Sequence, residues 1–94
     1  MSITSYRQFE TTRTAVNIGA WSAIVIPAGS IDATVTLEDT GATFRVTSNN
    51  ADALGTGAPV PAAGSYTFPG VTGADITLYI TPSAGTFAVL QVQR

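Results

Sequence analysis

The sequence predicts an all-β fold: a single-domain β-sandwich, jelly-roll-like or immunoglobulin-like, with about seven to eight short antiparallel strands. Apolar and polar residues alternate over short runs, which is the period of a half-buried strand. Turns rich in Gly and Pro separate these runs roughly every ten residues, a spacing typical of sandwiches and small barrels. No segment shows a sustained helical period of apolar residues.

The first residues are expected to form an extended N-terminal arm over residues 1–12, ahead of a β-sandwich domain over residues 13–94. β-branched and hydroxyl side chains dominate the arm, which favours an extended chain over a helical turn. Two interpretations stay open for it. It is either a frayed terminus or a segment that grips a neighbouring molecule through Tyr6 and Phe9.

The next strands are expected on either side of Gly19. Val16 and Ile18 alternate with polar or small neighbours, and residues 24–26 form the continuous apolar run Ile-Val-Ile. Such a short run is typical of a strand that is covered on both faces. Residues 27–29, Pro-Ala-Gly, are turn residues because Pro fixes φ and Gly accepts positive φ.

The cleanest alternation lies in residues 31–38, where the odd-numbered residues are apolar and the even-numbered residues are polar. Residues 39–41, Asp-Thr-Gly, turn the chain, and residues 43–48 return with Phe44 and Val46 facing inward. A loop of three to five residues between two such runs indicates a β-hairpin. We therefore expect these two strands to pair with each other.

The remainder of the chain reads as one long loop and three strands. Residues 49–61 are small and neutral, so we expect a loop there. Short strands follow at residues 65–68, 75–81 and 86–93. Their inward side chains are apolar: Tyr66, Phe68, Ile76, Leu78, Ile80, Ala88, Leu90 and Val92.

The composition excludes several function classes. The 94 residues form one domain and contain no His, no Cys and no Lys, and only 11% of them are charged. Four scattered Arg residues form no basic stripe, so we expect no nucleic-acid partner. No apolar run approaches the length that spans a membrane, so no membrane association is expected. Because sheet edges are normally guarded by charge, especially Lys, neighbours in an assembly are expected to cover them.

Catalysis would have to rely on carboxylates together with Ser or Thr. Asp32, Glu38 and Asp39 lie on one predicted strand and its turn, whereas Asp52 lies in the loop and Asp75 begins a strand. We expect no enzyme, no catalytic residue and no cofactor. A calcium site built from some of these carboxylates is the alternative to solvated turn residues, which we favour because Ca²⁺ needs six to eight converging oxygens.

Five residues are the candidate partner-binding residues. Tyr79 faces outward by alternation, and outward Tyr is enriched at interfaces, although a loop or second sheet can equally cover it. Arg45 also faces outward, where it can pair with Glu38 across the predicted hairpin or serve as an interface anchor. The other three lie in the arm: Tyr6, Arg7 and Phe9. The remaining aromatics are expected on or beside core positions: Trp21, Phe44, Tyr66, Phe68 and Phe87.

The order of motifs from residue 31 to residue 92 resembles a group of short virion structural proteins of tailed bacteriophages. The motifs are ATVTLEDTGATFRVTSNN, PAAGSYTF, PGVTGADITLYI and PSAGTFAVLQV. The resemblance implies a small β-sandwich that decorates or cements a capsid, or belongs to the head–tail structure, without catalytic residues. It implies a virion protein assembled in the host cytoplasm, with the major capsid protein or another virion protein as its partner.

These expectations converge on a capsid decoration protein, which would be a homo-oligomer whose closed symmetry, for example that of a trimer, hides its sheet edges. One alternative is a tail, neck or fibre-base subunit. Another is a glycan- or receptor-binding β-sandwich that uses Tyr79, Trp21 and the loop of residues 49–61.

Overall fold

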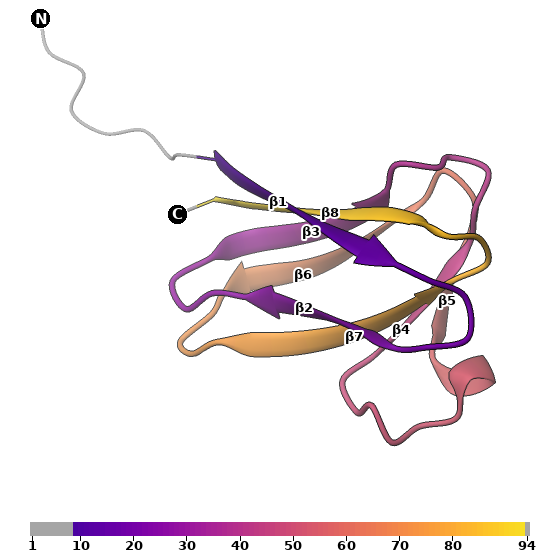
Figure 1. The fold of residues 1–94 in the computed structure, drawn as a ribbon. Coiled ribbons are helices and arrows are strands. Elements are labelled where there is room, and N and C mark those ends of the chain that lie inside the picture. The colour runs from indigo at the N-terminus through magenta and orange to yellow at the C-terminus, as the bar shows by residue number, and fades with distance from the viewer. Residues whose placement is uncertain (1–8, 94) are drawn as a thin grey trace, which may run out of the picture.

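The computed structural model describes residues 9–93 as eight β-strands and one short 3-10 turn (Figure 1). The strands are β1 (Phe9–Val16), β2 (Ser22–Ile26), β3 (Ile31–Leu37), β4 (Phe44–Thr47), β5 (Ala58–Val60), β6 (Ser65–Val71), β7 (Ile76–Pro82) and β8 (Thr86–Gln93). The 3-10 turn, η1, covers Leu54–Thr56 between β4 and β5.

The strands form two four-stranded antiparallel sheets that pack face to face (Figure 1). Sheet I has the order β1-β8-β3-β6, and sheet II has the order β2-β7-β4-β5. The pairs β1·β8, β2·β7, β3·β6 and β4·β5 are therefore nested, as in a hairpin that has been rolled up. This strand order is that of the jelly roll, so the predicted β-sandwich is confirmed.

The core lies between the two sheets and follows the predicted alternation. In β4, β7 and β8 the side chains predicted to face inward are buried or pack against the core, and in β3 Ala33, Val35 and Leu37 are buried. Ile31, also predicted to face inward, is only half-buried, and the pairing of β3 with β6 shifts register between Ile31 and Ala33. Tyr66 and Phe68 of β6 pack against it while half-buried. The buried apolar side chains are Val16, Ile24, Ile26, Ala33, Val35, Leu37, Ala42, Phe44, Val46, Val60, Leu78, Ile80, Ala88, Leu90 and Val92.

The predicted hairpin between residues 31–38 and 43–48 is wrong. β3 pairs with β6 and β8 in sheet I, whereas β4 pairs with β5 and β7 in sheet II. The turn between them crosses from one sheet to the other. Its backbone is fixed by Asp39, whose carboxylate accepts a hydrogen bond from the N–H of Gly41 at 2.9 Å. Ala42 is 4% exposed and closes this end of the core.

The sandwich begins earlier than the sequence analysis places it. β1 starts at Phe9, and residues 9–12 pair in register with residues 93–90 of β8, so they belong to sheet I and not to an arm. Residues 1–8, the rest of the predicted arm, lie outside the described residues. At the other end, β1 stops at Val16, and Ile18 is 65% exposed because it lies in the turn before β2.

Two further expectations need correction in sheet II. The run of residues 24–26 is covered on one face only: Ile24 and Ile26 are buried, but Val25 is 50% exposed. This exposure arises because β2 is an edge strand and the outer face of the sheet is open at this position. The predicted loop of residues 49–61 contains η1 and the edge strand β5.

Buried hydroxyl groups join the turns at the end of the sandwich near Pro27. Thr72 is 3% exposed, and its Oγ1 donates to the carbonyl of Pro27 at 3.0 Å and accepts from the N–H of Ser30 at 3.1 Å. Ser30 is fully buried, and its Oγ donates to the same Pro27 carbonyl at 2.6 Å. These bonds satisfy polar groups that would otherwise be costly to bury.

Candidate functional site

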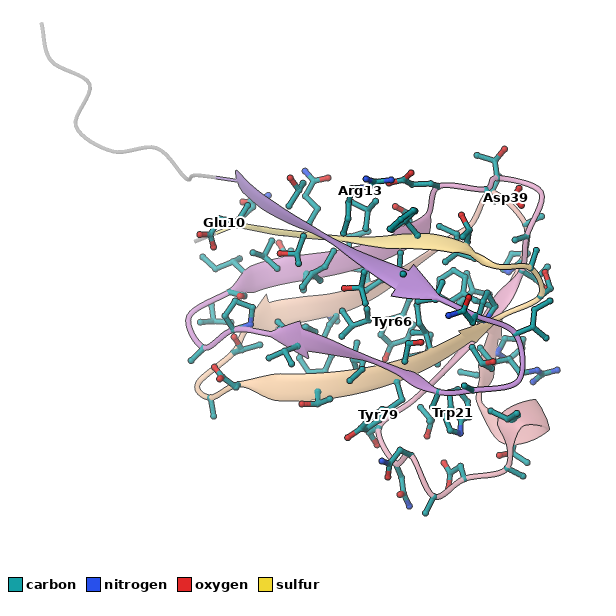
Figure 2. The ribbon with its side chains drawn as sticks, viewed as in Figure 1. Glu10, Arg13, Trp21, Asp39, Tyr66 and Tyr79 are labelled. Atoms are coloured by element: carbon teal, nitrogen blue, oxygen red, sulfur yellow. The ribbon has the colours of Figure 1, made fainter. Side chains whose placement is uncertain are left out.

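The outer face of sheet II carries two of the five candidate residues, Arg45 and Tyr79. Arg45 of β4 lies opposite Thr81 of β7, and Tyr79 lies between Ala23 of β2 and Thr47 of β4. Both candidate side chains are half-buried. Figure 2 shows Tyr79 and Trp21 on the side of sheet II that faces away from sheet I.

Side chains of Trp21, Arg45 and Thr47 hold the β4–β5 loop, residues 48–57, by hydrogen bonds. The indole Nε1 of Trp21 donates to the carbonyl of Asp52 at 2.8 Å, and the hydroxyl of Thr47 donates to the Asp52 carboxylate at 2.6 Å. Arg45 Nη1 donates to the carbonyl of Gly57 at 2.8 Å. These bonds come from residues before β2 and within β4, so they fix the loop relative to two strands of sheet II.

Gly57 allows the loop to approach the sheet closely. A Cβ on this residue would lie 2.9 Å from Cη2 of Trp21, 2.9 Å from the carbonyl oxygen of Val46 and 3.2 Å from Cβ of Arg45. Its φ of −67° is accessible to any residue, so the position needs glycine for space and not for conformation. The Trp21 ring therefore acts as a cover for the end of the loop.

Two open hollows flank Arg45, and both are lined by residues Thr43, Phe44 and Arg45. The first has a volume of about 340 Å³ and the second about 370 Å³. Apolar residues line much of both. In the first they are Ile18, Leu54 and Pro82. In the second they are Pro59, Val60 and Pro61.

Arg45 has no carboxylate partner in residues 9–93. Of the two roles left open for Arg45, pairing with Glu38 is excluded because the two residues belong to different sheets and Glu38 is paired with Arg13. Arg45 is instead bonded to one backbone carbonyl, that of Gly57. A guanidinium carries five N–H donors, so most of its donors remain available to a ligand or partner.

The other cation of the described surface is already neutralised. Arg13 of β1 donates from Nε and Nη2 to the two carboxylate oxygens of Glu38, and its guanidinium lies 4.0 Å from the ring centre of Phe87. Hydrogen bonds from Arg13 lower the pKa of the Glu38 carboxyl, and the same bonds raise the pKa of Arg13. This cluster lies on the outer face of sheet I.

The aspartate carboxylates accept hydrogen bonds at separate places in the fold instead of converging on one point. The carboxylates of Asp32 and Asp75 accept from the N–H groups of Gly70 at 2.9 Å and Ala28 at 2.8 Å. Within residues 9–93, no three potential metal-ligating side chains of His, Cys, Asp or Glu come together. Asp32 and Asp75 therefore each tie one backbone N–H group from a distant part of the chain.

The other three candidate residues are Tyr6, Arg7 and Phe9. Tyr6 and Arg7 lie outside the described residues, and Phe9 begins β1 in sheet I. The sequence did not predict the apolar residues that line the hollows beside Arg45. It also did not predict that Trp21 is half-buried against the β4–β5 loop instead of lying in the core. The only feature of the sequence that pointed to these hollows was the cluster of prolines around residue 60.

No protein-family model, curated protein or solved structure matches the chain. In the described part, no helix has the length and apolar character needed to cross a bilayer. Function is therefore inferred from the surfaces of the chain itself, above all from the outer face of sheet II.

Proposed function

We propose that this protein is a non-enzymatic structural protein of a bacteriophage virion: a capsid decoration protein that binds the major capsid protein and stabilises the head. The observation that carries the proposal is Arg45, a half-buried cation without an ion-pair partner in residues 9–93, set between two largely apolar hollows. This arrangement suits a protein surface that presents a carboxylate flanked by apolar side chains.

The chemistry of Arg45 favours a macromolecular partner. Arginine is enriched among the residues that dominate binding energy at protein interfaces. The hydrogen bond to Gly57 restricts the side chain before a partner arrives, so less conformational entropy is lost on binding. Docking would also remove water from the guanidinium, which strengthens a hydrogen-bonded contact with a carboxylate.

The fold and the sequence resemblance support the same reading. Eight-stranded jelly rolls occur in viral capsid domains, in lectins and in cupins, so the fold by itself leaves several functions open. The motifs that resemble phage virion proteins favour the first of these. A decoration protein needs no chemistry, because binding to the assembled shell and not to dissociated subunits stabilises the shell by mass action.

A glycan-binding role receives less support from the site. Trp21 is unavailable as a free stacking platform, because its indole N–H bonds to Asp52 and its ring covers Gly57. Tyr79 alone is a small aromatic platform. A tail, neck or fibre-base subunit uses the same kind of surface, and only the position in the particle separates it from a decoration protein.

The test mixes the purified protein with capsids that lack it and measures co-sedimentation and the temperature at which the shells disrupt. We expect many copies per shell and a raised disruption temperature. Arg45→Ala should weaken binding at least ~10-fold, which corresponds to about 1.4 kcal/mol. Arg13→Ala is the matched control and should bind like the wild type, because Arg13 is paired within sheet I.

Two results would overturn this proposal. If the protein does not bind the shells, it has no decoration role. If it binds only at the portal or tail, it is a head–tail protein and not a decoration protein. Equal binding by the Arg45→Ala variant and the wild type would remove the outer face of sheet II as the docking surface.

A further inference from the structure

The four edge strands of the sandwich are not equally protected. β5 has three residues and contains Pro59, and β2 has five residues. β6 contains Pro69 and Gly70, and its pairing with β3 shifts register. Prolines, register shifts and short length are the features by which sheet edges normally resist pairing with other chains.

β1 has none of these three features; its charged residues are Glu10 and Arg13, and Arg13 is paired with Glu38 on the outer face of sheet I. β1 is an eight-residue strand without Pro, Gly or Lys, and it pairs with β8 in unbroken register along its whole length. Its other edge has no strand beside it among residues 9–93. A long, regular edge of this kind presents a row of backbone donors and acceptors that another strand can use.

We infer that two copies of this chain associate by antiparallel pairing of β1 with β1, which joins the two sheets I into one continuous sheet. The contact is isologous, so it closes at two copies, whereas the trimer was the example of closed symmetry given for the expected homo-oligomer. The inference does not depend on capsid binding, because the dimer is expected for the isolated protein.

Symmetry and charge fix the register of this pairing. A two-fold axis perpendicular to the sheet leaves equivalent side chains of the two copies on the same face of the joined sheet. Directly opposed residues of antiparallel strands also lie on the same face. One residue must therefore lie on the axis, opposite its own copy. Glu10 or Arg13 at that position would place like charges opposite each other, which is destabilising.

Among the uncharged residues, Thr12 gives the most extensive pairing. With Thr12 on the axis, residues 9–15 of both copies pair, and Arg13 lies opposite Thr11. With Thr11 or Thr14 on the axis, the described strand pairs only over residues 9–13 or 12–16. Thr12 is exposed, so its side chain is free to meet its symmetry mate.

The test is a charge swap at the axis, read by light scattering during size-exclusion chromatography. The wild type should have the mass of a dimer at high concentration. Thr12→Lys and Thr12→Glu should each halve the mass, and an equimolar mixture should restore the dimer. Thr67→Lys is the matched control on β6, the opposite edge of sheet I, and should remain dimeric.

A cysteine scan tests the register without relying on charge, since the chain contains no cysteine. The Cα separation of opposed antiparallel residues, about 4.5–5.5 Å, falls within the range that a disulfide spans. Thr12→Cys should therefore cross-link on oxidation, whereas Thr67→Cys should not. A wild type that is monomeric or trimeric, a dimer that survives Thr12→Lys, or cross-linking at Thr67→Cys alone would overturn the inference.

Discussion

Replacement of Gly57 by alanine should destabilise the protein because of three close contacts. The added Cβ would lie 2.9 Å from the Trp21 ring, 2.9 Å from the Val46 carbonyl oxygen and 3.2 Å from the Arg45 Cβ. None of these atoms moves easily: the ring is held by its bond to Asp52, and the Val46 oxygen belongs to the backbone of β4. Overpacking of this kind costs about 1–3 kcal/mol in the free energy of unfolding.

The assay is thermal unfolding followed by circular dichroism. A loss of about 1 kcal/mol lowers the Tm of a domain of this size by about 4–8 °C, so Gly57→Ala should lower the Tm by about 4–24 °C. Gly55→Ala is the matched control in the same loop, because no heavy atom lies within 4 Å of its added Cβ. It should leave the Tm unchanged or raise it slightly.

A double variant tests the role of the indole. Trp21→Ala removes one of the two closest contacts, so its effect combined with Gly57→Ala should be smaller than the sum of the single effects. Equal Tm values for Gly57→Ala and Gly55→Ala would refute the close packing of the loop beneath Trp21. Strict additivity in the double variant would assign the cost to the Val46 carbonyl oxygen and the Arg45 Cβ, without a share for the indole.

Three further perturbations test the core, the buried hydroxyl groups and the surface ion pair. Ile26→Ala should lower the free energy of unfolding by about 2–5 kcal/mol in denaturant titrations, whereas Ile18→Ala, at a position 65% exposed, should change it by less than about 0.5 kcal/mol. Thr72→Val should cost about 0.5–1.5 kcal/mol per lost hydrogen bond in the same assay, because the hydroxyl bonds to the Pro27 carbonyl and the Ser30 N–H disappear while both groups keep their bonds to each other; an unchanged midpoint would contradict this role. Since Arg13 lowers the pKa of Glu38, the stability from this pair should be present above the pKa of an unfolded Glu and fade as the pH falls through the lower folded value. Arg13→Ala should raise the Glu38 pKa in a carboxyl NMR titration, and an unmoved titration curve would disprove the coupling.

The sequence predicted most of the strands because their side chains alternate between a face toward the core and a face toward solvent, whereas the three-residue β5 is too short to show such a pattern. The alternation in residues 31–37 and 76–82 is visible without any knowledge of which strands are neighbours. Because the alternation does not depend on which strands are neighbours, it could not show that β3 and β4 belong to different sheets, and their pairing was predicted wrongly. A short turn with Asp39 and Gly41 serves a hairpin or a crossing between sheets equally well, and the strands on either side alternate identically in both cases.

The candidate site was only partly accessible to the same reasoning. The outward positions of Arg45 and Tyr79 follow from their place in the alternation. The hollows beside Arg45 do not, because they form only where the β4–β5 loop and Pro82 meet β4. The contact of Trp21 with Gly57 joins distant parts of the chain through a residue that has no side chain, so no pattern of apolar residues marks it.

The nested order of the strand pairs has a consequence for how the chain reaches this structure. Only β4 and β5 are consecutive strands that pair, and β1 must wait for β8 before it gains a neighbour in its sheet. Topologies dominated by contacts between distant residues fold slowly, over milliseconds to seconds. β1 is synthesised before the other strands of the sandwich, and its partner β8 is synthesised after them. We therefore expect the sandwich to assemble only once β8 has been made, in one cooperative step that begins around the β4–β5 hairpin.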